Sequence, residues 1–293
     1  MAIIVNKKNK FSTNVRKKHK NNKLLNVTLA TAWRLSPAFT ASIIKQFFFQ
    51  PNKYKLSQKE NDYKKTALAF ETVVRNKKIR GWKWGNGPAI LLVHGWNSAG
   101  LQLYKFIDPL LERGFSVITY DKPAHGISEG THTSYFEFTD VVRHLLNHPV
   151  LNNIKGIIGH SMGASAVINA ISKENVKPRL VLFAPALPIK EMLYETITGF
   201  GIPESILTQL LLQYELEYSY SIDHDNPIAL IPQIKTDALI IHDKNDKATP
   251  YSYSVKAAEM NPKIHLFSTN GLGHGRVIFD DHLIQKSISF LEK

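Results

Sequence analysis

One short segment constrains the fold of this chain more than any other. The G-x-S-x-G segment Gly159–Gly163 closes the apolar run Ile154–His160, and small residues follow it at positions 164–166. An apolar run of this length bounded by a glycine turn predicts a buried strand, and the following residues begin a helical pattern. Glycine is needed on both sides of such a sharp turn, because the neighbouring chain passes too close for a side chain. The segment therefore predicts a strand–turn–helix unit that exposes Ser161 at its turn.

Short apolar runs recur after Lys64 and alternate with helical patterns. This alternation predicts an α/β fold with a mostly parallel sheet flanked by helices on both faces. Six buried strands are expected, at Ala89–His94, Phe115–Asp121, Ile154–His160, Leu180–Ala184, Ala238–His242 and Ile264–Phe267. Two antiparallel strands, Glu71–Arg75 and Ile79–Trp84, would precede them and give an eight-stranded sheet. Helices are expected at Leu101–Arg113, Ser134–Asn147, Met162–Lys173, Ser252–Met260 and Asp280–Leu291.

A long interval without strand signal separates two of these strands. Between Pro185 and Pro232 the sequence holds only helical patterns, such as Met192–Ile197 and Ile206–Tyr218. We therefore expect a helical cap at about 185–232, inserted into a domain that spans 65–293. Its apolar residues suggest an apolar lid, although such residues at helical spacing are more often packing residues; they are Met192, Leu193, Tyr194, Phe200, Leu207, Leu211 and Leu212.

The positive charge of the chain is concentrated at its amino-terminal end. The net charge is +13, and 13 Lys and Arg residues lie between Lys7 and Lys59 with no acidic residue before Glu60. Residues 60–293 are balanced, so the whole surplus belongs to residues 1–59. The absence of cysteine excludes disulfides, cysteine-ligated metals and thiol nucleophiles. We expect a cytoplasmic protein, since reducing compartments do not use disulfides.

Residues 1–64 are predicted to form a basic tail followed by an amphipathic helical arm. Residues 1–23 are rich in Lys, Arg and Asn, and Ser36-Pro37 then provides an N-cap and first-turn pair. Leu35, Phe39, Ile43 and Phe47 follow at a spacing of four. No run of about 18 residues is uninterruptedly apolar, so a membrane-spanning helix is not expected.

Two roles for this arm stay open. It can dock on the catalytic domain as an extra packing element, or the basic segment can attach peripherally to an anionic membrane surface. No nucleic-acid partner is expected, because the tail lacks the interleaved aromatic residues of a single-strand binder and no known DNA-binding module follows it.

Two further motifs accompany the turn at Ser161. His94-Gly95-Trp96 stands at the end of an earlier strand, and the segment Asp121–Ser128 reads D-K-P-A-H-G-I-S. Together the three motifs resemble the α/β-hydrolase superfamily over about residues 82–293. The resemblance implies the α/β-hydrolase fold with Ser161 as nucleophile. Ala124 departs from it, because the superfamily often has glycine at this position.

The same resemblance implies an oxyanion hole built from the backbone N–H groups of Trp96 and Met162. The supporting residues would be His94, Gly95, Gly159 and Gly163. A tetrahedral oxyanion carries charge that the ground-state carbonyl lacks, and losing one preorganised donor costs roughly 3–4 kcal/mol of barrier.

A serine hydroxyl needs a base to remove its proton, and histidine suits that task near neutral pH. Among twelve histidines, His274 lies in a glycine-rich segment between the last strand and the last helix, where the superfamily carries its base. Asp246 aligns with the superfamily's catalytic carboxylate, and Asp243 is its rival three residues earlier. The order Ser161, Asp246, His274 is that of the superfamily.

These residues predict acyl chemistry. A serine at the turn argues against the superfamily's dehalogenases and epoxide hydrolases, which use aspartate there. We expect a serine hydrolase that cleaves a carboxylic ester or thioester, of apolar acyl type, through an acyl-enzyme. A serine aminopeptidase-like or acylglycerol lipase-like enzyme, an acyltransferase and a non-catalytic binding protein are the alternatives. We expect a small-molecule ester or acyl substrate as the partner, and neither cofactor nor metal, since no H-E-x-x-H or similar ligand spacing occurs.

Overall fold

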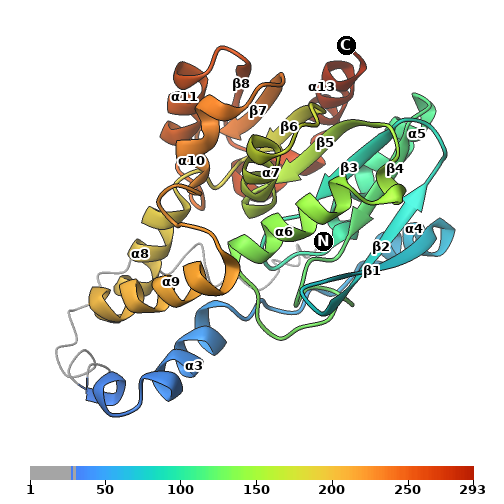
Figure 1. The fold of residues 1–293 in the computed structure, drawn as a ribbon. Helices are drawn as coiled ribbons and strands as arrows, with labels where there is room; N and C mark the ends of the chain where they lie inside the picture. The colour runs from blue at the N-terminus through green and yellow to red at the C-terminus, as the bar shows by residue number, and fades with distance from the viewer. Residues whose placement is uncertain (1–27, 29–30) are drawn as a thin grey trace, which may run out of the picture.

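The computed structural model describes residue 28 and residues 31–293, and its centre is an eight-stranded sheet (Figure 1). The strand order is β1-β2-β4-β3-β5-β6-β7-β8. The strands are β1 (Leu68–Val74), β2 (Lys77–Trp84), β3 (Ala89–Val93), β4 (Ser116–Tyr120), β5 (Ile154–His160), β6 (Arg179–Phe183), β7 (Ala238–Asp243) and β8 (Ile264–Thr269). Only the pairings of β2 with β1 and β4 are antiparallel. The expected fold class is confirmed, while the predicted tail, residues 1–23, lies outside the described residues.

The register of the parallel strands brings their carboxyl ends together. Val93 pairs with Gly159, so β3 and β5 end at the same level. His160 pairs with Phe183 of β6, and Asp243 of β7 pairs with Thr269 of β8. Loops that leave this edge therefore start side by side, which is where ligands bind in open α/β sheets.

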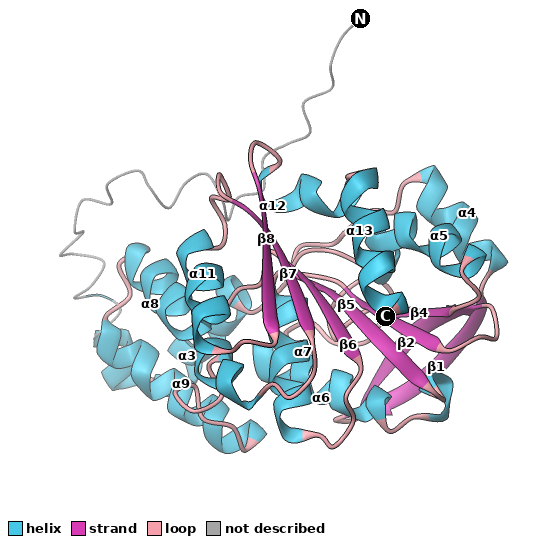
Figure 2. Ribbon diagram, turned by 90° about the horizontal axis from the view of Figure 1, so that it is seen from above, coloured by secondary structure: helices cyan, strands magenta, loops and turns pink. Residues whose placement is uncertain are grey.

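Helices cover both faces of the sheet, because its parallel strands are apolar on both sides. One face carries α6 (Tyr135–Leu146), α7 (Met162–Lys173) and α11 (Tyr251–Met260), and the other carries α5 (Ile107–Glu112) and α13 (Asp281–Glu292) (Figure 2). The predicted helix Leu101–Arg113 divides into a 3-10 segment, η1 (Gly100–Phe106), which is itself kinked at Leu103, and α5. Short helical turns also occur at η2 (Pro149–Leu151), α12 (Gly273–Arg276) and η4 (Val277–Phe279).

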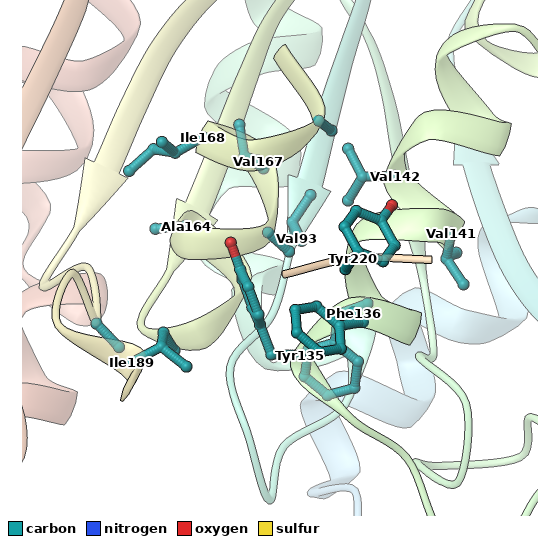
Figure 3. Packing of buried hydrophobic residues seen from close by; sticks show 14 of the residues in the cluster. Val93, Tyr135, Phe136, Val141, Val142, Ala164, Val167, Ile168, Ile189 and Tyr220 are labelled. Atoms are coloured by element: carbon teal, nitrogen blue, oxygen red, sulfur yellow. The ribbon is translucent and has the colours of Figure 1, made fainter. Parts of the chain in front are cut away.

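The larger apolar core lies between the sheet and the α6–α7 face. Figure 3 shows Val93 of β3 close to Phe136 of α6 and Val167 of α7. Phe136 also stacks on Tyr220, with ring centroids 5.0 Å apart. Helix α7, which begins at the turn of Ser161, is thus held against the sheet along its length.

The predicted cap interval is helical in the structure. Between β6 and β7 the chain forms α8 (Ile189–Gly199), α9 (Glu204–Tyr218), α10 (Pro227–Leu230) and η3 (Ile231–Gln233). Leu207 and Leu211 are buried packing residues, whereas Leu212 is exposed, and Met192, Leu193 and Tyr194 are partly buried. Packing therefore explains only some of the apolar cap residues for which the sequence suggested a role in a lid.

The amino-terminal arm contains α3 (Pro37–Phe48), which lies beside α9 (Figure 1). Trp33 Nε1 donates a hydrogen bond of 2.7 Å to Gln209 Oε1, and Phe49 stacks on Tyr214 with ring centroids 4.8 Å apart. Ser36 occupies the predicted N-cap position, but its side chain makes no capping hydrogen bond. Within residues 28 and 31–293, no helix is long and apolar enough to cross a membrane.

A helix that sequence patterns did not predict follows the arm. Helix α4 (Gln58–Thr66) starts with a capping box, in which Ser57 accepts from the Glu60 N–H and Glu60 accepts from the Ser57 N–H. The S-x-x-E spacing was the available signal, and the low apolar content of the helix concealed it. Trp84 Nε1 of β2 donates to Tyr63 O at 3.2 Å, which ties α4 to the sheet.

Replacement of Gly163 by alanine should destabilise the fold. A methyl group there would lie 2.2 Å from His94 O and 2.5 Å from Val93 O, so α7 would have to move away from β3. We expect Gly163→Ala to lower the free energy of unfolding by about 3 kcal/mol, as measured by urea denaturation. Gly199→Ala is the matched control, because no atom lies within 4 Å of the added methyl group. Equal stability of the two variants would contradict the close-packing account.

Candidate active site

Ser161 occupies a strained turn between β5 and α7. Its backbone angles are φ 54° and ψ −128°, in a region that residues other than glycine rarely adopt. The Ser161 N–H donates to Phe183 O at 2.9 Å, and Ser161 O accepts from the Ser165 N–H at 3.2 Å. A methyl group at Gly159 would lie 2.7 Å from Ala164 Cα, so both glycines of the segment are needed for packing.

His274 connects Ser161 to Asp246. Its Nε2 lies 2.9 Å from Ser161 Oγ, and its Nδ1 lies 2.7 Å from Asp246 Oδ2. His274 belongs to the short helix α12, where the sequence indicated a glycine-rich loop. Its side chain is 24% exposed and that of Asp246 is fully buried, so the connection runs from a reachable hydroxyl to a water-excluded carboxylate. The structure thus joins three residues that are far apart in the sequence.

The Asp246 carboxylate is held by many donors. Its Oδ1 accepts from the N–H groups of Ala248 and Thr249 at 2.7 and 3.0 Å, and its Oδ2 accepts from Thr249 Oγ1 at 2.9 Å. Burial alone would raise the pKa of Asp246, but hydrogen bonds from His242 and His274 hold it below its ordinary value. The carboxylate is therefore ionised and fixed in orientation.

Asp243, the rival for the acid position, has a different set of partners. Its oxygens accept from the Asn245 N–H, the Thr269 hydroxyl and the Leu272 N–H at 2.8 to 2.9 Å. These bonds join the end of β7 to the segment that leads into α12. Asp243 thus contributes to the placement of His274 without contacting its ring.

Sequence patterns missed two residues of this network, His242 and Thr249. His242 Nε2 lies 3.2 Å from Asp246 Oδ2, and its Nδ1 lies 2.7 Å from Ser254 Oγ. Thr249 Oγ1 lies 3.3 Å from both His242 Nε2 and His274 Nδ1. His242 stands inside a buried strand, where the sequence gives no sign of a functional contact.

The segment after β3 lies against the turn of Ser161. A methyl group at Gly95 would be 3.1 Å from Ser161 Cβ. The Asn97 N–H donates to His125 Nε2 at 3.2 Å, so this amide is already engaged, which favours the Trp96 amide as an oxyanion donor. Met162 is the first residue of α7, and an N–H at a helix start has no acceptor within the helix. This end of the helix also carries its positive dipole charge.

Buried histidines support this segment. His94 Nε2 accepts from the Lys122 N–H at 3.1 Å, and its Nδ1 lies 2.8 Å from Gly95 O. His125 is arranged in the same way, with its Nδ1 2.9 Å from Pro123 O. One ring nitrogen accepts and the other donates, so each ring is neutral with a fixed tautomer. Burial, reinforced by Lys122, lowers the pKa of both histidines.

Lys122 is a fully buried lysine that the sequence did not single out. Its ammonium nitrogen contacts His94 O and lies 4.1 Å from the centre of the Phe138 ring. Burial lowers the pKa of Lys122 well below its usual range. Ala124, two residues later, has φ 61°, a left-handed conformation that favours glycine, the residue that the resemblance led us to expect there.

His160, beside the nucleophile, contacts the segment that carries His274. Its Nε2 lies 3.0 Å from His274 O, and the two rings are 4.9 Å apart. Burial lowers the pKa of His160 to about 3, so the ring is neutral and donates to this carbonyl. The position of the His274 backbone is thus fixed from the strand that bears Ser161.

The fold and these motifs define the class of protein. The model of the alpha/beta hydrolase family matches residues 90–283, well over half of the chain, and the chain belongs to this family.

Particular relatives are more distant. The chain is 28% identical to the uncharacterized protein YqkD of Bacillus subtilis (strain 168), over 62% of this chain and 63% of that relative's length. The Pyrococcus furiosus esterase Pf2001 superposes with a TM-score of 0.63 at 21% identity, covering 83% of this chain and 97% of the esterase. A thioesterase domain from the curacin biosynthetic pathway superposes with a TM-score of 0.55 at 17% identity, covering 78% of this chain and 99% of that domain. At these identities the solved structures show a shared fold.

Acid should destabilise the protein through its buried histidines. Burial lowers the pKa of His125 and of His160 to about 3, against an ordinary value of 6.5 that the unfolded chain regains. Between these values the unfolded state binds more protons than the folded one, so the free energy of unfolding falls as pH is lowered. At pH 5 we expect a loss of about 2 kcal/mol for each histidine, measured by urea denaturation against pH 7.

His125→Gln is the control for this titration. Because the variant lacks one of the two histidines, unfolding it at pH 5 should take up about one proton fewer than unfolding the wild type. Its free energy of unfolding should therefore fall less between pH 7 and pH 5. A free energy of unfolding that is the same at both pH values would contradict neutral burial of these rings.

Proposed function

We propose that the protein is a serine hydrolase that cleaves a carboxylic ester or thioester through an acyl-enzyme intermediate. The observation that carries the proposal is the hydrogen-bond chain from Ser161 Oγ through His274 to Asp246, with distances of 2.9 and 2.7 Å. Nucleophile, base and orienting acid stand in the geometry that this chemistry requires.

In the first step His274 Nε2 takes the proton of Ser161 Oγ while the oxygen attacks the substrate carbonyl. Asp246 accepts the Nδ1 hydrogen of His274, which selects the tautomer with a free Nε2 and stabilises the imidazolium that forms. The protonated ring then gives its proton to the leaving alcohol or thiol. A water molecule, activated by the same ring, releases the acid and restores the Ser161 hydroxyl.

The tetrahedral intermediate places its negative oxygen beside the start of α7. We assign its stabilisation to the N–H groups of Trp96 and Met162, since Gly95 lies against Ser161 and the Asn97 amide is engaged. Backbone donors fixed before the reaction need no reorganisation when the charge develops. The buried rings of His94 and His125 hold this segment in place.

An ester or thioester substrate with an apolar acyl group fits the surroundings best. The Trp96 ring lies 5.4 Å from His125 and 5.6 Å from Phe138, and Trp96, Met162 and Met192 are partly buried against one apolar cluster. The names of the Pyrococcus furiosus esterase and of the curacin thioesterase domain agree with this substrate class. No feature of the described residues specifically favours an amide or acylglycerol substrate.

Substitution of the nucleophile tests the reaction. Ser161→Ala should abolish hydrolysis of p-nitrophenyl esters and labelling by a fluorophosphonate, because no other hydroxyl in the described part of the chain, residues 28 and 31–293, is bonded to His274 Nε2. The comparison is run over a series of acyl lengths, so that the wild-type enzyme also reports its acyl preference. Thermal unfolding serves as the control, and full turnover by a folded Ser161→Ala protein would refute the assignment.

The two aspartates should separate in their effects. Asp246→Asn removes the acceptor that orients His274, and we expect kcat to fall by about 10⁴-fold with little change in KM. Asp243→Asn should instead lower the free energy of unfolding by about 1–3 kcal/mol, because it weakens buried hydrogen bonds, and should retain far more activity than Asp246→Asn. If folded Asp243→Asn is as inactive as Asp246→Asn, the acid has been assigned to the wrong residue.

A further inference from the structure

The amino-terminal arm exposes a row of large apolar side chains. Phe39, Ile43 and Phe47 follow one another at a spacing of four along α3 and are 65, 45 and 72% exposed, and Leu35, just before the non-helical Ser36, is 81% exposed. Residues four apart lie on one side of a helix. The row, which we call the α3 ridge, is therefore a continuous apolar strip that faces solvent.

Packing of the arm does not explain this strip. The face of α3 that contacts the rest of the molecule buries Thr40, Ala41 and Ile44, and Trp33 and Phe49 on either side of the helix are buried as well. The arm is therefore anchored without the ridge residues, which lie on the opposite side of the helix and add nothing to this packing. Large exposed apolar surface on a folded protein is typical of an interaction site.

The charge around the ridge indicates what it binds. No acidic residue occurs before Glu60, and 13 Lys and Arg residues lie between Lys7 and Lys59. In the described part of this segment, Arg34, Lys53, Lys55 and Lys59 are exposed. Basic residues beside an apolar helix face are complementary to an anionic bilayer, where the charges meet lipid headgroups and the apolar side chains enter the acyl boundary.

We propose that the α3 ridge is a peripheral membrane-binding surface that inserts into anionic lipid bilayers. The proposal is independent of the chemistry at Ser161. The helix lies in the membrane plane with Phe39 and Phe47 buried among acyl chains, and the basic segment binds the headgroups.

The position of the arm connects this surface to the candidate active site. Helix α3 packs against α9 of the cap through Trp33 and Phe49 (Figure 1). The chain after α3 then reaches the segment that follows β3, where the Asn52 N–H donates to Asn97 Oδ1 at 2.7 Å. Asn97 adjoins Trp96. The arm that carries the ridge is therefore hydrogen-bonded to the segment beside Trp96.

Vesicle binding by the full chain tests the proposal. The probe is a set of sucrose-loaded vesicles of phosphatidylcholine, with or without roughly one third phosphatidylglycerol. Wild-type protein should sediment with the anionic vesicles and less with neutral ones or at high salt, because the charges are screened. The double variant Phe39→Gln, Phe47→Gln should bind anionic vesicles at least about 10-fold more weakly.

Exposed apolar residues elsewhere provide the matched control. Leu68 and Val73 on the edge strand β1 are 72 and 54% exposed, and the double variant Leu68→Gln, Val73→Gln should bind vesicles like the wild type. Thermal unfolding and hydrolysis of a soluble p-nitrophenyl ester report whether each variant is folded. The single variants Phe39→Gln and Phe47→Gln replace the double variant if that protein fails to fold.

Three results would overturn the proposal. The first is a wild-type protein that does not sediment with anionic vesicles. The second is a folded ridge variant that binds as well as the wild type, which would leave binding to the charges alone. The third is a wild-type protein that is a dimer in light scattering, becomes a monomer on ridge substitution, and binds vesicles in neither form. That result would make the ridge a contact between two copies of the chain.

Discussion

The close approach of α7 to β3 is the constraint on which the rest of the site depends. The backbone of Gly163 lies so near His94 O that no side chain fits between them, and Gly159 lies equally close to Ala164. These contacts force Ser161 into its left-handed conformation and keep it there. They also set the distance between the start of α7 and the segment that carries Trp96. The strain at one residue is thus maintained by packing on both sides of it.

Around this turn the polar groups are fixed by neutral rather than charged partners. His94, His125 and His160 each use their ring nitrogens to join backbone segments, and burial keeps all three uncharged. The carboxylate that contacts His274 is that of Asp246, which accepts from two backbone amides and three side chains. The three neutral rings therefore add no positive charge that would compete with His274 for this carboxylate.

Motifs predicted the parts of the site that backbone geometry requires, and missed the parts that depend on tertiary contact. The glycines around Ser161 were predictable because local sterics restrict the residue types allowed there, and the ends of β3 and β7 were predicted to within one residue, at His94 and His242. The contact of His242 with Asp246 was not predictable, because it arises only when the chain after β7 folds back. Strand positions were predictable from apolar runs, whereas the polar helix α4 was not. In the arm the sequence indicated a helix, but not that Phe39 and Phe47 face outward while Trp33 and Phe49 are buried.

Backbone hydrogen bonds at the end of the arm join it to the catalytic domain. Phe49 O accepts from the Thr133 N–H at 2.9 Å, and the Asn52 N–H binds Asn97 Oδ1. A chain shortened to begin at residue 65 would leave Thr133 and Asn97 without these partners and would uncover Tyr214, on which Phe49 stacks. The smallest unit that retains every contact of the segment beside Trp96 is therefore longer than the region that resembles other α/β hydrolases. Sequence comparison alone would place its start too late.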